Sequence, residues 1–114
     1  NCLMDLREYQ EWTEAERTDI IRKAPDDYDR VTYDTMGVAK EAGELADVWA
    51  KQARGALTPE EFREDMLLEL GDTLHYLARL AYDLGFTLEE VADVNVQKLT
   101  NRKLYGKGGH GKRS

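Results

Sequence analysis

Cysteine is nearly absent from this chain, since Cys2 is the only one. No disulfide can therefore form within the chain, and we expect a reducing compartment. Long apolar runs are missing as well, because no stretch reaches the roughly 18 residues that a membrane-spanning helix needs. The first ten residues also lack the layout of a signal peptide. These absences predict a cytoplasmic protein that has no membrane partner.

Basic residues are scarce over most of the chain. The formal charge is −7, and the segment from Lys103 onward has four basic residues and no acid, so the residues before it carry −11. Binding of DNA or RNA depends on Lys and Arg side chains that neutralise phosphates. The acidic body therefore argues against a nucleic-acid partner. It suits a protein that binds metal ions first and a polyanionic ligand through them.

Strand-like alternation of apolar and polar residues is absent too, and only two prolines occur. Apolar residues recur instead at steps of three and four, as in helices packed along one face. The sequence predicts an all-α fold, a compact helical bundle of about four helices in one domain over residues 1–104. The predicted helices cover residues 3–22, 28–54, 59–84 and 88–104. Residues 105–114 are predicted to be a flexible, basic, Gly-rich tail, whose role as a lid over phosphates stays open.

Capping residues mark the ends of these helices. Thr58 and Glu61 match a capping box at the start of the third helix, and Thr87 and Glu90 match another at the start of the fourth. The second and third helices are each followed by a glycine suited to a C-cap, namely Gly55 and Gly85. We expect the apolar stripe of the third helix to be buried: Leu67, Leu70, Leu74, Leu77, Ala81 and Leu84.

Two pairs of acidic residues carry most of the functional information. Glu41 and Glu44 lie in KEAGELADVW, and Glu69 and Asp72 lie in EDMLLELGDTLHYL. Each pair is spaced i,i+3, so its two carboxylates share one face of a helix. If the two helices pack side by side, four carboxylates converge, and like-charge repulsion favours a hard divalent cation between them. This arrangement predicts a magnesium site, with Mn²⁺ as a substitute ion.

The residues alone leave a metal site and an ordinary solvated or salt-bridged helix face equally open. Gly43 and Gly71 each lie beside an acid inside a predicted helix, which indicates close approach of another helix or a ligand. Trp49 falls on the apolar stripe and is predicted to lie in the core. Tyr76 lies one turn after Asp72 and is predicted to donate a hydrogen bond near the metal.

The sequence resembles a known family at this point. EAGE, 24 intervening residues and ELGDTLHYL resemble the ExxE…ExxD signature of the MazG-like, all-α nucleoside triphosphate pyrophosphohydrolases, and NVQKLTNR resembles a further segment of that family. The resemblance implies hydrolysis of nucleoside triphosphates between the α- and β-phosphates, for control of the nucleotide pool. It also implies that Mg²⁺ is held by four acids, Glu41, Glu44, Glu69 and Asp72. Of these, Glu41 or Glu44 would activate the attacking water.

The same resemblance assigns roles in the fourth helix. Lys98 and Arg102 would contact the triphosphate, and Asn95 would be a further polar ligand of metal or substrate. Without the resemblance, a basic helix end favoured by the helix dipole explains Lys98 and Arg102 as well. Family members of this size assemble into oligomers, so we expect a homodimer or homotetramer in which a neighbouring subunit completes the site between the two central helices.

Two other classes of protein remain open. A ferritin-like di-iron protein would use Asp72 and His75, but that class needs two Glu-x-x-His helices. Only one other histidine exists, His110, and it lies in the predicted tail. The second class is a non-enzymatic, acidic helical module that binds metal or another protein. If it is an interaction module whose acids are solvated, Mg²⁺ would not raise its melting temperature.

Overall fold

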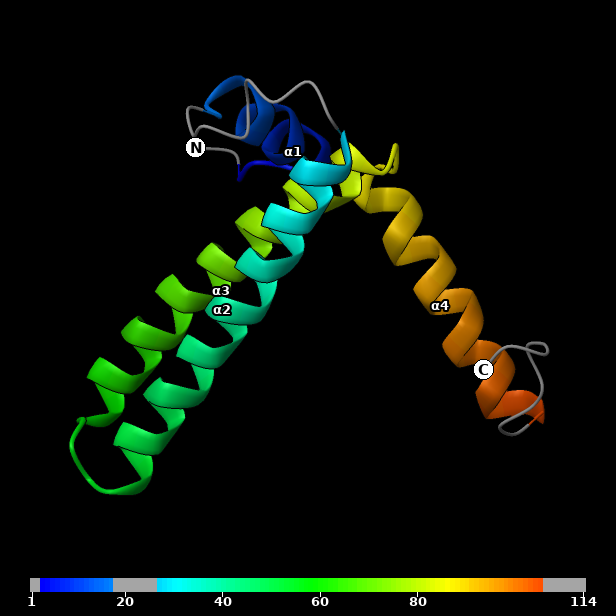
Figure 1. Cartoon of the computed structure of the whole chain (residues 1–114). Coiled ribbons are helices and arrows are strands. Elements are labelled where there is room, and N and C mark those ends of the chain that lie inside the picture. Colours follow the sequence, from blue (N-terminus) through cyan, green and yellow to red (C-terminus); the bar gives the residue numbers. More distant parts are fainter. Residues whose placement is uncertain (1–2, 18–26, 106–114) are drawn as a thin grey trace.

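The computed structural model describes residues 3–17 and 27–105, and every regular element in these ranges is a helix. The prediction of an all-α fold with four helices is therefore confirmed (Figure 1). The predicted tail and the end of the first predicted helix, residues 106–114 and 18–22, lie outside the described residues. The helices are α1 (Leu6–Ala15), α2 (Asp27–Ala53), α3 (Pro59–Asp83) and α4 (Leu88–Tyr105).

The helix ends follow the capping residues of the sequence. The Thr58 Oγ1 accepts a hydrogen bond of 3.0 Å from the Glu61 backbone N–H, and the Glu61 side chain accepts one of 2.9 Å from the Thr58 N–H. Thr87 and Glu90 make the same reciprocal pair at the start of α4. Gly55 and Gly85 have positive φ angles of 76° and 84°, as a C-terminal cap requires.

The first helix is shorter than the sequence analysis predicts. It begins after Asp5, which forms a capping box with Glu8, and it ends at Ala15, so that residues 16 and 17 are not helical. The Asp5-x-x-Glu8 spacing is a signal of this start that the apolar pattern hides. Just beyond this end, the Arg17 side chain is buried and pairs with Asp34 on α2 and Asp83 on α3.

The helices form an open arrangement around a long hairpin. Figure 1 shows α2 and α3 packed along their length, α1 lying across one end of this hairpin, and α4 leading away from it. The radius of gyration is 17.1 Å, whereas a compact domain of this length has about 13 Å. The four helices therefore do not close into the single compact bundle that the sequence suggests. One end of the hairpin carries most of the packing between α1, α3 and α4.

The α2–α3 interface uses different faces from those expected. Trp49 is 62% exposed and Leu67 is 71% exposed, so their predicted burial is wrong for a single chain. On α2 the buried side chains include Glu41 and Val48 instead. At Gly37 the helices approach so closely that an added Cβ would lie 2.3 Å from the Tyr76 ring.

Gly43 and Gly71 have a different environment from Gly37. A Cβ at either of them would meet no atom of another described residue within 4 Å. Close helix packing within the chain therefore does not explain these two glycines. Their position beside Glu44 and Asp72 leaves room for a ligand or another chain.

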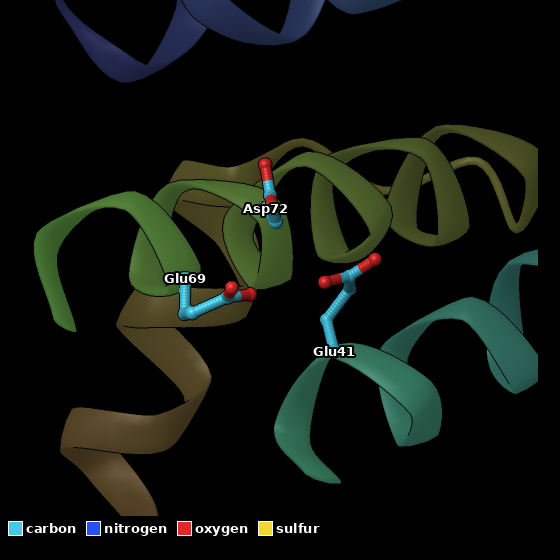
Figure 2. Close-up of side chains that lie close together, drawn as sticks. All are labelled: Glu41, Glu69 and Asp72. Atoms are coloured by element: carbon cyan, nitrogen blue, oxygen red, sulfur yellow. The ribbon is translucent and has the colours of Figure 1, made fainter. Parts of the chain in front are cut away.

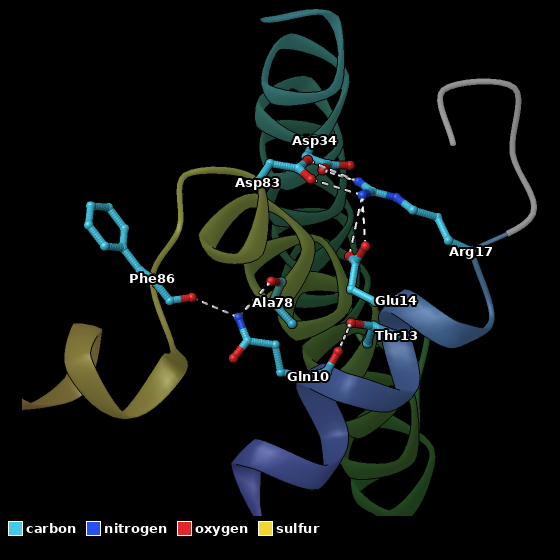
Figure 3. A network of polar contacts seen from close by, with 8 residues as sticks. All are labelled: Gln10, Thr13, Glu14, Arg17, Asp34, Ala78, Asp83 and Phe86. Carbon is cyan, nitrogen blue, oxygen red and sulfur yellow. Dashed lines mark hydrogen bonds and ion pairs between the residues drawn. The ribbon is translucent and has the colours of Figure 1, made fainter. Parts of the chain in front are cut away.

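A buried ionic network fixes α1 against the hairpin. The Arg17 guanidinium donates to both oxygens of Asp83, at 2.9 and 3.0 Å, and it also pairs with Asp34 (Figure 3). A further contact of 3.2 Å joins Arg17 to Glu14 on α1, the helix that ends just before it. The side chains of Arg17, Asp34 and Asp83 are almost fully buried. One cation thus links all three helices α1, α2 and α3.

Three carboxylates face this single guanidinium, and their pKa values separate accordingly. Burial, together with hydrogen bonding to Asp83, raises the pKa of Asp34 to about 7. Burial alone would also raise the pKa of Asp83, but hydrogen bonds from Arg17 and Asp34 hold that pKa below its usual value. Of these two buried carboxyls, Asp34 is therefore the one that binds a proton first as the pH falls.

Asp34 is expected to make stability depend on pH. Its pKa is higher in the folded chain than its usual value of about 4, so the folded state binds more protons between pH 4 and 7 and stability falls as pH rises through this window. The free energy of unfolding should decrease from pH 5 to pH 8 by on the order of 2 kcal/mol. Urea titrations should show that Asp34→Asn lacks most of this decrease. An equal decrease in both proteins would contradict the assignment.

Candidate functional site

Three of the four predicted acids lie together in the hairpin. Glu41 on α2 and Glu69 and Asp72 on α3 each offer a carboxylate oxygen, and these oxygens all lie within 4.8 Å of one another. Figure 2 shows the Glu41 and Glu69 carboxylates directed towards each other across the two helices. The Asp72 carboxylate is directed towards the side on which α1 lies. The i,i+3 spacing on α3 and the packed face of α2 produce this convergence.

The environment of Glu41 and Glu69 is unusual for carboxylates. Glu41 is only 6% exposed. One oxygen of each, Oε1, is buried and has no hydrogen-bond partner among the described residues. The other Glu41 oxygen pairs with the exposed ammonium of Lys40 at 3.2 Å. Buried carboxylate oxygens without partners are costly, so the arrangement favours a bound cation.

Glu44 lies at the edge of this cluster. It is half-buried and does not belong to the group of three whose oxygens lie within 4.8 Å. Its charge nevertheless acts on the group, because burial followed by the charges of Glu44, Asp72 and Glu41 raises the pKa of Glu69. The four acids thus form one electrostatic unit, in which negative charge accumulates unless a cation offsets it.

The predicted substrate-binding residues lie elsewhere in the chain. Asn95, Lys98 and Arg102 are exposed on α4. Among the described residues α4 contacts α1 and α3 but not α2, and it leads away from the acids in Figure 1. A single chain therefore does not bring these three residues to the acidic cluster.

Tyr76 has surroundings that differ from the prediction of a bond near the metal. Its ring packs over Gly37 and lies 6.3 Å from the Tyr33 ring. Burial, followed by the neighbouring Tyr33, raises the pKa of the Tyr76 hydroxyl. The structure places Tyr76 in the α2–α3 interface, where its ring packs against Gly37 of α2.

A groove beside the acids was not predicted from the sequence. It lies between α1 and α3 and has a volume of about 390 Å³. Asp72 is one of its lining residues and also belongs to the acidic cluster. The i,i+3 pair Tyr9 and Trp12 forms its wall on α1. Its complete lining is Tyr9, Trp12, Leu67, Leu68, Gly71, Asp72 and His75.

His75 belongs to this groove and not to a metal ligand set. Its ring lies 6.4 Å from the Trp12 ring and 5.6 Å from the Tyr76 ring. Within residues 3–17 and 27–105, the group of possible metal ligands contains carboxylates only. The donor set therefore does not resemble the Glu-x-x-His pattern of di-iron proteins.

None of the described helices is both long and apolar enough to cross a bilayer.

The chain is similar to a known protein family and to a phage protein. The model of the MazG nucleotide pyrophosphohydrolase domain matches residues 34–105. The Gene 37 protein of Mycobacterium phage L5 is 41% identical over 84 residues, which cover 71% of this chain and 73% of that protein. No solved structure is significantly similar to the chain. The matched range contains all seven predicted site residues and excludes α1.

Proposed function

The chain belongs to the family of MazG nucleotide pyrophosphohydrolases, and from this premise we propose that it hydrolyses nucleoside triphosphates at the bond between the α- and β-phosphates. The products are a nucleoside monophosphate and pyrophosphate. Deoxynucleoside triphosphates, and with them control of the nucleotide pool, are proposed as the substrate class by analogy with the family. The observation that supports the proposal most directly is the group of three carboxylates, in which Glu41 and Glu69 each have one buried oxygen without a hydrogen-bond partner among the described residues.

The donor set fits a hard divalent cation. Mg²⁺ prefers oxygen ligands and binds through one or two carboxylates together with substrate phosphates. Glu41, Glu69 and Asp72 would hold the ion, with Glu44 as a fourth acid beside them, and Mn²⁺ would substitute for it. When bound, such an ion lowers the pKa of coordinated water and offsets charge on phosphoryl oxygens.

The residues of the chain itself supply the remaining steps. Glu41 or Glu44, whichever carboxylate oxygen stays free, orients the attacking water and accepts its proton. The acids exclude a bare triphosphate by charge repulsion, so the substrate is bound only as its metal complex. Lys98 and Arg102 are proposed to offset charge on the phosphates, with Asn95 as a further polar contact.

A second copy of the chain is proposed to bring α4 to the acids. Along α4, apolar side chains such as Val94, which is 63% exposed, lack a covering partner in the single chain. The hairpin likewise exposes Leu70 and Leu77. Burial of such surfaces favours self-association. A homodimer or homotetramer would place Lys98 and Arg102 of one copy at the Glu41 cluster of its neighbour.

Mixing two inactive variants tests this shared site. If each site combines Glu41 of one copy with Lys98 of another, a Glu41→Gln and Lys98→Ala heterodimer has one intact site. Mixing and re-annealing should then restore about a quarter of the parent activity. Sites contained within one chain would give no recovery. Light scattering on each variant should establish that both still assemble.

The reaction itself is tested with the eight common ribo- and deoxynucleoside triphosphates. In Mg²⁺, the expected products are monophosphate and pyrophosphate, and EDTA should abolish their release. Diphosphate and orthophosphate would indicate cleavage at the wrong bond and contradict the proposal. Mg²⁺ should also raise the melting temperature, because an ion that binds only the folded chain stabilises it. If Mg²⁺ neither supports cleavage nor raises the melting temperature, the non-enzymatic interaction module remains as the explanation.

A further inference from the structure

The groove between α1 and α3 provides a surface suited to a flat aromatic ligand. The Tyr9 and Trp12 rings lie 6.1 Å apart at an interplanar angle of 26°, and His75 adds a third ring beside Trp12. Trp12 remains 48% exposed although it lines the groove. An indole that is held in place but half-exposed can stack on a second ring.

The α1 wall of the groove is held in a defined orientation. The Gln10 side chain donates to the carbonyl oxygens of Ala78 and Phe86, at 3.3 and 3.0 Å (Figure 3). It also accepts a hydrogen bond of 3.2 Å from the Leu88 N–H. Arg17 fixes the other end of α1 through its buried network. Because these contacts set the rotation of α1, Tyr9 and Trp12 are pre-positioned and little ordering is needed on binding.

The groove is continuous with the acidic cluster through Asp72. This residue lines the groove and also lies within 4.8 Å of the Glu41 and Glu69 oxygens. A ligand whose charged part is held at the cluster therefore reaches the aromatic wall with its adjoining part. In a nucleotide, the part that adjoins the phosphates and carries a π-face is the sugar with its base.

We propose that this groove binds the nucleobase of the substrate, which stacks on Trp12 while the phosphates lie at Glu41, Glu69 and Asp72. The proposal rests on the function proposed above and adds the residues that bind the base. Tyr9 and Trp12 lie outside the range 34–105 that matches the family. The wall that contacts the base is thus contributed by a segment beyond the matched domain, while the acids come from within it.

Fluorescence offers a direct test, because Trp12 and Trp49 are the two tryptophans of the chain. In a Trp49→Phe background, all tryptophan emission comes from Trp12. With Mg²⁺ present, α,β-imido analogues of the four deoxynucleoside triphosphates should quench this emission, and inorganic tripolyphosphate, which lacks a base, should not. Equal quenching by tripolyphosphate, or no quenching by any nucleotide that binds, would overturn the proposal.

Kinetics provide the second measurement. Trp12→Ala should raise KM by about 5- to 100-fold, as expected for loss of one stacked base, with a much smaller change in kcat. Trp49→Ala, which removes an exposed tryptophan from α2, is the matched control and should leave KM unchanged. An unchanged KM in Trp12→Ala would overturn the base site.

These outcomes separate the groove from the reaction. Hydrolysis that persists with unaltered KM in Trp12→Ala would leave the proposed function intact and remove the base site. Nucleotide quenching of Trp12 without any hydrolysis would support the base site and contradict the hydrolase. Trp12 emission that responds to protein concentration and not to nucleotide would show that a second copy covers the groove, and this result would also overturn the proposal.

Discussion

Replacing Glu41 by glutamine is expected to lower the rate of nucleotide hydrolysis by about 10²- to 10³-fold or more. The substitution removes the charge of a buried carboxylate that lies with Glu69 and Asp72 in the acidic cluster. Steady-state pyrophosphate release at saturating Mg²⁺ measures the effect. Asp47→Asn, a change of an exposed acid on the same helix, is the matched control and should retain the parent rate.

The stability of the Glu41→Gln variant distinguishes a functional role from a structural one. Without Mg²⁺, the melting temperature should stay the same or rise, because the substitution relieves repulsion among neighbouring carboxylates. With Mg²⁺, the stabilisation seen in the parent should be largely lost. A variant that is less stable without metal but fully active would show that Glu41 supports the fold and not the reaction.

Replacing Arg17 by methionine is expected to destabilise the fold by about 3–5 kcal/mol, since it leaves Asp34 and Asp83 buried without their cation. Urea denaturation at pH 8 measures the loss. Because Asp34 is protonated more readily at lower pH, the loss should be smaller at pH 5. Arg17→Lys keeps the charge but not the two-pronged contact with Asp83, so it should give an intermediate loss.

Arg7→Met is the matched control for this second prediction. Arg7 pairs with Glu89 at 3.2 Å, but both side chains are substantially exposed, and exposed ion pairs contribute about 0–1 kcal/mol. Similar small losses in the Arg7 and Arg17 variants would mean that the buried network does not hold α1. A loss that is large only for Arg17 would establish that burial gives this ion pair its effect.

Local signals in the sequence were sufficient for the helices and their ends. Thr58, Glu61, Thr87 and Glu90 satisfy backbone groups within three residues of themselves, so their effect does not depend on distant parts of the chain. The same holds for Gly55, whose positive φ is a local requirement. Residues 16 and 17 were wrongly predicted to be helical, and the buried partners of Arg17, which lie far away in the sequence, could not be read from the local pattern.

The faces of the helices were harder to predict. Leu67 and Trp49 satisfy an apolar spacing but remain exposed in the single chain, whereas Glu41 is buried. Periodicity identifies a face that is able to pack, and it does not say whether the partner is another helix of the same chain or a second copy. The groove at Trp12 was missed because its two walls come from helices that are separate in the sequence.

The sequence by itself determined that the chain is helical, where three of its helices begin and end, and which carboxylates share a helix face, since all of these follow from interactions over three or four residues. Only the tertiary structure decided that Glu41 meets Glu69 and Asp72, that Arg17 is buried between Asp34 and Asp83, and that α4 leads away from the acids. These outcomes depend on the rotation of each helix about its axis and on the angle at which it leaves its neighbour. Both are set by close packing between residues far apart in the chain, such as Gly37 against Tyr76.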